Sequence, residues 1–214
     1  GGVDLDEIER LRGMADALPV ALPADLPLVI NPRGFRPGSV RNDTFFQAIP
    51  LVLERLPEVH FVCPGMAGQP EALKWVERFH LQERVSLLPF LTQAQLWGLF
   101  QRAAVTVSVS QHDGTPNTLL EAMACGCFPV AGDIESIREW ITPGVNGLLV
   151  QPAQAQELAE ALLIALQNAD LRERAAAANA LLVAQRASAP LVRQAALDYY
   201  QCVLAGPQAD PQPL

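Results

Sequence analysis

The chain has 214 residues and a formal net charge of −8, from 15 Lys and Arg against 23 Asp and Glu. Hydrophobic residues make up 50% of it and charged residues 18%, which is enough apolar material for one sizeable core and excludes a disordered chain, a collagen-like rod and a disulfide-stapled mini-protein. An acidic chain lacks the surplus cations that neutralise a phosphate backbone, so we expect no nucleic-acid partner. A free mononucleotide needs only one or two cations and stays possible.

The cysteines and the hydropathy pattern limit the compartment and the kind of site. None of Cys63, Cys125, Cys127 and Cys202 stands in the C-x-x-C spacing of a zinc site, so we expect no metal and interpret them as buried free thiols in a reducing, cytoplasmic compartment. No stretch reaches the ~18 apolar residues of a transmembrane helix, and no signal peptide is recognisable. The chain starts at Gly1 without Met, and we expect it to be a piece of a longer protein.

In chain order, residues 4–18 predict an amphipathic helix, and the prolines that follow it make residues 1–27 a linker or brace. An alternation of short apolar runs and helical stretches follows, with Asp43 and Thr92 as expected N-caps and Gly126 as a left-handed helix stop. The expected strands span residues 28–31, 59–63, 85–88, 104–108, 128–131 and 147–150. The expected helices span residues 43–56, 70–80, 92–102, 116–125 and 135–141.

Strands that are apolar along their whole length and separated by helices are typical of a parallel sheet covered on both faces. The fold class is therefore α/β: a Rossmann-like, doubly wound parallel sheet of about six strands, with C-terminal helices over residues 154–204 broken at Asp170 and Pro190. We expect one domain over residues 28–205 and a disordered tail over residues 206–214.

Ligands of such sheets sit at the carboxyl ends of the strands, and the loop after the fourth strand is chemically unusual there. Thr115 is the expected N-cap of the next helix and Pro116 its first residue, while Gly114 permits close approach of the backbone to a ligand. The N–H groups from Asn117 to Leu119 should then point outward at the positive end of the helix dipole, where phosphate or sugar oxygens bind.

Two carboxylates flank this helix entry. Asp113 precedes the turn and Glu121 lies just over one turn inside the helix, so both can face one crevice and accept hydrogen bonds from the hydroxyls of a polyhydroxylated ligand. On spacing alone, a turn-forming Asp113 and an ordinary helical Glu121 explain the pair equally well. The loop after the first strand lacks G-x-G-x-x-G, which argues against a dinucleotide cofactor.

The pair Asp113 and Glu121, with seven residues between, resembles the E-x7-E motif of the group 1 retaining glycosyltransferases of GT-B fold, with Asp in the first acidic position. Similarity to that family covers about residues 2–170, and the motifs that carry it are specific when they occur together. Its other parts are the whole run from Ser108 to Gly126, Pro129–Asp133, Glu139, Gly144–Val150 and the opening Gly2–Asp6.

The resemblance implies the C-terminal, nucleotide-sugar-binding half of a two-domain enzyme, whose acceptor domain is absent, so we expect nucleotide binding with little transfer by this chain alone. It also implies roles. Glu121 would hold the ribose hydroxyls, Asp113 the transferred sugar, and Arg33 the diphosphate. The backbone from Gly114 through Thr115 and Pro116 to Asn117 would contact sugar and diphosphate, and that of Pro89, Phe90 and Leu91 the base.

One departure from the family pattern concerns the diphosphate. The family places a lysine five residues after the arginine, and this sequence has Gly38 there. Arg36 or Arg41 could supply the missing cation, and we favour Arg41 because it directly precedes the helix at Asp43. The alternative is that both arginines are solvated loop residues. With guanidinium groups and a helix dipole at the diphosphate, no metal is expected.

Other functions stay open at this stage. A degenerate, non-catalytic module is one alternative, and Gly38 is the sequence feature in its favour. A sugar-nucleotide epimerase or a phosphorylase of similar architecture is another. An epimerase would release free nucleotide without an acceptor, and a phosphorylase is disfavoured because no lysine near the crevice could host pyridoxal phosphate. His112 is the only histidine near the motif; a general base is one interpretation, and a variable loop residue is the stronger one.

Overall fold

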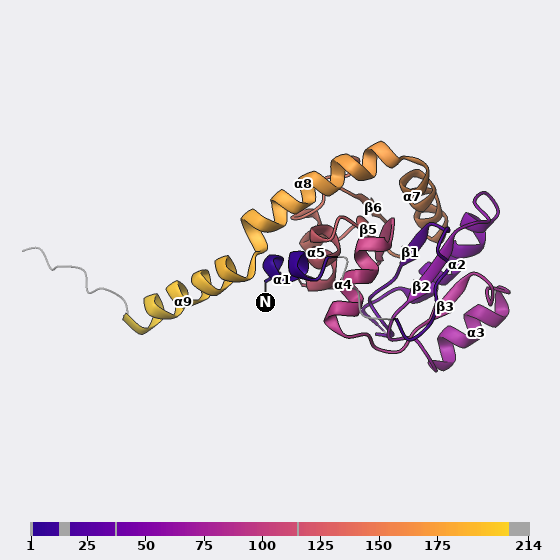
Figure 1. Ribbon diagram of the computed structural model, residues 1–214, viewed down its shortest axis with the longest axis horizontal. Coiled ribbons are helices and arrows are strands. Elements are labelled where there is room, and N and C mark those ends of the chain that lie inside the picture. The colour runs from indigo at the N-terminus through magenta and orange to yellow at the C-terminus, as the bar shows by residue number, and fades with distance from the viewer. Residues whose placement is uncertain (1, 13–17, 37, 115, 206–214) are drawn as a thin grey trace, which may run out of the picture.

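The computed structural model describes residues 2–12, 18–36, 38–114 and 116–205. Its centre is one sheet in the order β3-β2-β1-β4-β5-β6, in which every neighbouring pair is parallel (Figure 1). This confirms the predicted Rossmann-like α/β class. The strands are β1 (Leu28–Ile30), β2 (His60–Cys63), β3 (Val85–Leu87), β4 (Val105–Ser108), β5 (Phe128–Gly132) and β6 (Leu148–Val150).

Helices cover both faces of the sheet, which explains why the central strands are buried along their whole length and mostly apolar. One hydrophobic cluster joins α2, α3 and α7 to one face, and a second joins α1, α4, α5, α6 and the end of α8 to the other. The helices are α1 (Leu5–Arg10), α2 (Asn42–Leu53), α3 (Pro70–Arg78), α4 (Gln93–Arg102), α5 (Asn117–Ala124), α6 (Glu135–Arg138), α7 (Ala155–Gln167), α8 (Ala169–Ala187) and α9 (Ala189–Ala205).

The predicted N-terminal helix over residues 4–18 is too long. The helix α1 ends at Arg10, and Leu18 is not helical. The apolar residues that suggested a continuous stripe, Leu11 and Leu18 among them, still pack against the cluster on the α4 and α5 side. Leu11 is the C-cap residue of α1 and Leu18 lies outside a helix, so the apolar periodicity overestimated the length of the helix.

Two of the predicted helix starts are also wrong in detail. Arg41, not Asp43, is the N-cap of α2, and Asp43 lies in the first turn. Pro116 is the N-cap of α5 rather than its first helical residue, with an extended backbone, and Thr115 lies outside the described residues. The Thr92 cap of α4 is confirmed and forms a capping box with Gln95.

Other boundaries differ by a few residues, as is usual at frayed helix ends. The predicted helix 135–141 shortens to α6, and the C-terminal breaks fall at Asn168 and Ser188 instead of Asp170 and Pro190. Gly126 has the predicted left-handed backbone, with φ of 84°. The predicted tail over residues 206–214 lies outside the described residues.

The N-terminal end of the described chain is joined to the C-terminal helices. Val3 forms a parallel bridge with Ser188, at the junction of α8 and α9. The N–H of Val3 donates to Ala187 O (2.7 Å), and Val3 O accepts a hydrogen bond from the N–H of Ala189 (2.8 Å). Residues before α1 are thus paired with the C-terminal helices. From that junction α9 extends away from the rest of the molecule (Figure 1).

The strand order places a topological switch point between β1 and β4. From these neighbouring strands the chain continues to helices on opposite faces of the sheet, α2 and α5. The loops that follow the two strands separate at this point and leave a crevice at the carboxyl edge, which is where ligands of open parallel sheets bind.

Candidate functional site

The loop after β1 and the loop after β4 are joined by backbone hydrogen bonds. Val40 and Ser110 form an antiparallel bridge. The N–H of Arg41 donates to Val109 O (2.9 Å), and that of Gln111 donates to Ser39 O (2.9 Å). These bonds fix the two loops relative to one another, so side chains that reach across the crevice meet in a defined geometry.

Arg33 and Asp113 make the main side-chain contact across the crevice. The Arg33 guanidinium forms an ion pair with the Asp113 carboxylate and also donates to Thr118 Oγ1 of α5 (3.2 Å). Only 8% of the Arg33 side chain is exposed. Burial lowers the pKa of Arg33; the Asp113 charge opposes that shift, and the nearby Arg36 charge adds to it. Two arginines therefore share one small region.

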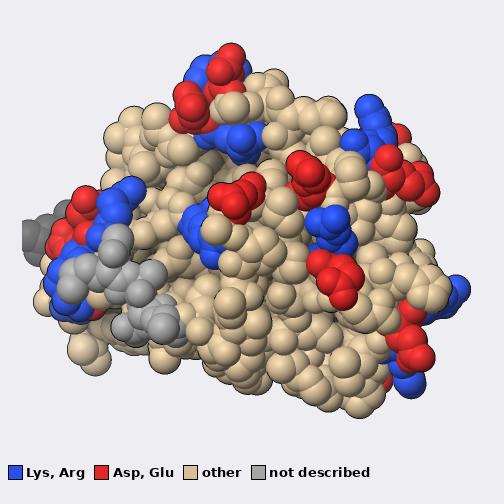
Figure 2. All heavy atoms as spheres, turned by 45° about the vertical axis from the view of Figure 1, so that its right-hand side comes forward, with Lys and Arg blue, Asp and Glu red and all other residues tan. Residues whose placement is uncertain are grey.

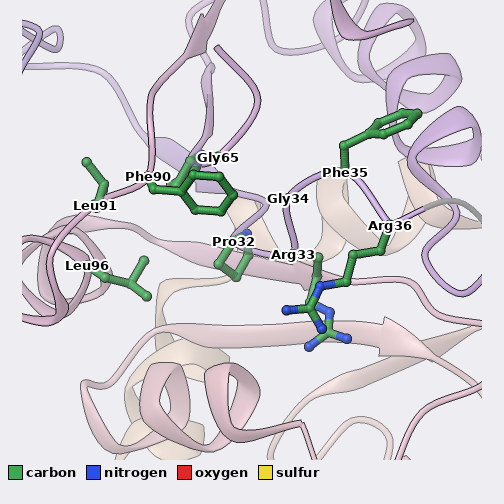
Figure 3. A pocket seen from close by; sticks show the side chains of 10 residues that line it. Pro32, Arg33, Gly34, Phe35, Arg36, Gly65, Phe90, Leu91 and Leu96 are labelled. Atoms are coloured by element: carbon green, nitrogen blue, oxygen red, sulfur yellow. The ribbon is translucent and has the colours of Figure 1, made fainter. Parts of the chain in front are cut away.

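A hollow of about 270 Å³ opens beside these arginines, and we term it the switch-point pocket. Figure 3 shows the Arg33 and Arg36 guanidinium groups next to one another at one end, with Phe90 and Leu96 at the other. Its lining residues are Pro32, Arg33, Gly34, Phe35, Arg36, Pro64, Gly65, Phe90, Leu91 and Leu96. Cationic at one end and apolar at the other, this pocket matches an elongated anion that carries a flat apolar group.

Phe90 forms the apolar end with an exposed ring. Its side chain is 85% exposed, although large apolar groups are normally buried. Gly65 lies under the ring: it has φ of +75°, and a Cβ built on it would stand 3.0 Å from the ring edge. The Gly65 N–H donates to Pro89 O (3.1 Å), so the loops after β2 and β3 are held together at this end.

Arg41 lies in a different hollow. Its guanidinium forms two hydrogen bonds to the Asp43 carboxylate (2.8 and 2.7 Å), and both residues line a separate hollow with Trp75 and Gln111. The structure therefore does not bring Arg41 to Arg33, whereas Arg36 is beside it. In Figure 2 acidic and basic side chains likewise lie next to one another over the visible face.

The main chain of Asp113 is also held in place by a hydrogen bond. The Ser136 hydroxyl, in the short helix α6, donates to Asp113 O (2.9 Å). One contact thus orients the Asp113 carboxylate toward Arg33, and another fixes the main chain that carries it. Gly114, the next residue, is exposed.

The start of α5 offers fewer free donors than the sequence suggested. The N–H of Leu119 is used within the helix, because it donates to Pro116 O (2.9 Å), so the predicted outward direction of that group is wrong. Asn117 is exposed at the first helical position, and Thr118 contacts Arg33. The beginning of α5 therefore meets the pocket through a side chain.

Glu121 lies on the same side of α5 as Thr118, since residues three apart are neighbours on a helix surface. One of its carboxylate oxygens accepts a hydrogen bond from the Gln93 amide of α4 (3.0 Å). Burial raises the pKa of Glu121, while donors from Gln93 and Trp97 oppose the shift. Glu121 does not line the pocket itself; it contacts α4, whose Leu96 lines the pocket.

Family membership follows from comparison with known proteins. The family model described as "Glycosyl transferases group 1" matches residues 36–168, more than half of the chain. The chain belongs to the group 1 glycosyltransferases. This confirms the resemblance seen in the Asp113 and Glu121 motif.

Two curated glycosyltransferases illustrate the similarity. A GDP-mannose:cellobiosyl-diphosphopolyprenol alpha-mannosyltransferase from Xanthomonas campestris is 30% identical over 127 residues, which are 57% of this chain and 33% of that protein. An alpha-D-kanosaminyltransferase from Streptomyces kanamyceticus is 26% identical over 133 residues, 62% of this chain and 34% of that one. The present chain thus spans about a third of the length of these relatives.

Solved structures share the fold at lower identity. A glycosyltransferase from Rickettsia africae has a TM-score of 0.79 and 17% identity over 96% of this chain and 56% of its own. Anabaena HepE, solved with UDP-glucose, has a TM-score of 0.76 and 20% identity over 94% of this chain and 56% of its own. The C-terminal domain of the Francisella tularensis group 1 protein LpcC, with a TM-score of 0.70 and 21% identity, matches 86% of this chain and 98% of its own.

Several residues of this glycosyltransferase site could not be predicted. Ser136, Thr118 and Gln93 contact Asp113, Arg33 and Glu121 from elements distant in sequence, and nothing in the local sequence marks them. Arg36 was an open alternative, and only the loop geometry distinguishes it from Arg41.

In the described part of the chain, no group of three or more His, Cys, Asp or Glu residues could hold a metal ion. None of the described helices has the length and apolarity needed to cross a bilayer. His112 is exposed in the loop before Asp113.

Proposed function

We propose that this domain binds the nucleoside-diphosphate sugar donor of a retaining glycosyltransferase. The observation that carries the proposal is the pairing of Arg33 and Arg36 at one end of a pocket whose other end is the exposed ring of Phe90. Two adjacent guanidinium groups repel one another and favour a divalent anion between them. An aromatic ring a short distance away favours stacking of a flat base.

The neighbouring residues fit the remainder of such a donor. The Asp113 carboxylate, which is paired with Arg33, would accept hydrogen bonds from hydroxyls of the transferred sugar. Glu121 would accept hydrogen bonds from hydroxyls of the ribose. The backbone of Pro89, Phe90 and Leu91 would bound the base. The predicted contacts of Gly114, Thr115, Pro116 and Asn117 with sugar and diphosphate stay predictions.

The second cation at the diphosphate is Arg36 in this proposal. It lines the pocket beside Arg33, whereas Arg41 is paired with Asp43 in another hollow. Gly38, at the family's lysine position, has a left-handed backbone with φ of +83° and carries no side chain to the pocket. Guanidinium groups stabilise a departing diphosphate by charge, so the mechanism needs no metal ion.

Retention, by attack on the face from which the leaving group departs, is the chemistry that the family resemblance implies. The chain spans about a third of its curated relatives, and we propose that an acceptor domain elsewhere in the enzyme completes the site. The domain alone would then bind donors without transferring the sugar to a glycan, lipid or small-molecule acceptor. Cys63, Cys125 and Cys127 are buried free thiols as expected, and they support a reducing, cytoplasmic location; the expectation is wrong for Cys202, which is exposed.

Isothermal titration calorimetry with UDP, GDP and ADP tests the proposal. GDP is included because the Xanthomonas campestris relative is named for GDP-mannose. We expect one of these nucleoside diphosphates to bind. Arg36→Ala and Glu121→Ala should lower the affinity for it, whereas the matched control Arg41→Ala should leave this affinity unchanged. Weakening by Arg41→Ala instead of Arg36→Ala would reassign the second cation.

A non-catalytic module that kept the fold is the second candidate, and Gly38 in place of the family's lysine is the observation that favours it. Such a module would not bind any of the three nucleoside diphosphates at millimolar concentration. The same titration therefore separates the two functions.

A further inference from the structure

Gln93 is the first residue of α4 and contacts Glu121 of α5, 28 residues later in the sequence. Its side-chain amide donates to Glu121 Oε2 (3.0 Å), and Gln93 is exposed. Water competes for such a hydrogen bond, so it contributes little to the stability of the fold. Its position suggests a role in ligand binding rather than in folding.

We propose that Gln93 recognises, together with Glu121, the 2′,3′-diol of the donor's ribose and so selects ribonucleotides. This inference rests on the proposed donor-binding function and adds to it a residue that determines specificity. The position of Gln93 in the chain fits this role. Gln93 lies two residues after Leu91, the last residue of the segment that we expect to contact the base. A ribose joined to a base at Phe90 lies between that segment and the two arginines.

The chemistry of a diol requires both kinds of partner. A hydroxyl group donates one hydrogen bond and accepts others, whereas an ionised carboxylate only accepts. Glu121 can therefore take the hydroxyl protons but cannot satisfy the hydroxyl lone pairs. A glutamine amide beside it supplies N–H donors for those lone pairs. The hydrogen bond to Glu121 uses one of the two N–H groups of the Gln93 amide.

Trp97 adds a second N–H donor to the face of α4 that carries Gln93. It lies four residues after Gln93, so the two side chains leave the helix on one side. The indole N–H of Trp97 is buried and has no hydrogen-bond partner of normal geometry among the described residues, although it is near enough to lower the pKa of Glu121. Glu121 is thus a half-buried carboxylate bordered by N–H donors from α4.

A double comparison of protein and ligand tests the proposal. The variant Gln93→Met keeps the length of the side chain but removes its hydrogen bonds, and Gln101→Met is the matched control on the same helix, where the amide instead contacts Ile8 O. Each protein is titrated by calorimetry with UDP, GDP and ADP. The ribonucleotide that binds is then compared with its 2′,3′-dideoxy counterpart.

We expect the wild type to prefer the ribonucleotide and Gln93→Met to reduce that preference by about threefold to tenfold, the value of one or two hydrogen bonds. The dideoxy ligand should bind the wild type and Gln93→Met equally, and Gln101→Met should behave as wild type. An unchanged preference in Gln93→Met, or an equal loss for both ligands, would overturn the role of Gln93 and leave donor binding intact. Absence of binding of all three ribonucleotides by the wild type would instead overturn the proposed function itself.

Discussion

The Arg33 guanidinium at the end of β1 forms an ion pair with the Asp113 carboxylate 80 residues later, at the end of β4. These strands are neighbours only because the strand order reverses between them. The pair therefore exists because of the topology, and it spans the crevice in which a ligand of this fold binds. It also means that part of the charge of Arg33 is compensated before any anion arrives.

Asp113→Asn should separate the binding of the diphosphate from the binding of the sugar. Without the carboxylate charge, Arg33 is freer to attract phosphate, so we expect the affinity for the nucleoside diphosphate to rise at least by about twofold to fivefold, the range of exposed ion pairs, since this pair is mostly buried. The ratio of affinities for the nucleotide sugar and the nucleoside diphosphate should fall, because a hydroxyl acceptor is weakened. Calorimetry with both ligands measures the two effects, and a lower diphosphate affinity would contradict this role of Asp113.

Glu121→Gln should stabilise the fold in a pH-dependent way. Burial raises the pKa of Glu121 above its usual 4.5, so the folded state resists ionisation and this residue reduces stability as pH rises through that pKa. We expect the variant to melt at a higher temperature than wild type near pH 7, and the difference to disappear below about pH 4, where the carboxyl is neutral in both states. Thermal denaturation at several pH values tests this, and a constant difference at all pH values would exclude ionisation as its cause.

The buried pair Asn146 and Asn179 should be important for stability. Asn146 Nδ2 donates to Asn179 Oδ1 (2.9 Å), and Asn179 Nδ2 donates to Asn146 O (2.9 Å), which ties the loop before β6 to α8. Asn179→Ala leaves buried polar groups unpaired, and we expect a loss of about 2–4 kcal/mol in the free energy of unfolding. Urea denaturation measures it, with Gln185→Ala on the exposed side of α8 as control; equal, small effects of both would refute the role of the pair.

Gly126→Ala should be destabilising through the backbone alone. Gly126 ends α5 with φ of +84°, and an added Cβ would find only Ala176 Cβ, at 3.8 Å, an ordinary contact. The cost is then that of an L-residue in the left-handed region, about 1–2 kcal/mol. Urea denaturation of the two proteins gives this value, and an unchanged midpoint would mean that the backbone relaxes.

The sequence was most informative where structure is local or repetitive. Runs of four or five mostly apolar residues predicted all six strands, because strands covered on both faces carry few polar residues. Helix ends were less predictable: Arg41 caps α2 through its backbone alone, without a side-chain signal. The neighbours of Asp113 and Glu121 could not be predicted, because Ser136 and Gln93 reach them only after the sheet has formed.

The most direct test of the account is to locate a bound nucleoside diphosphate by amide chemical-shift mapping of the ¹⁵N-labelled chain. We predict that the ligand selected by calorimetry shifts the amides of Arg33, Arg36, Phe90 and Thr118 at the switch-point pocket. Shifts confined to the hollow around Trp75 and Arg41, or no shifts at millimolar ligand, would contradict the claim that this pocket holds the donor.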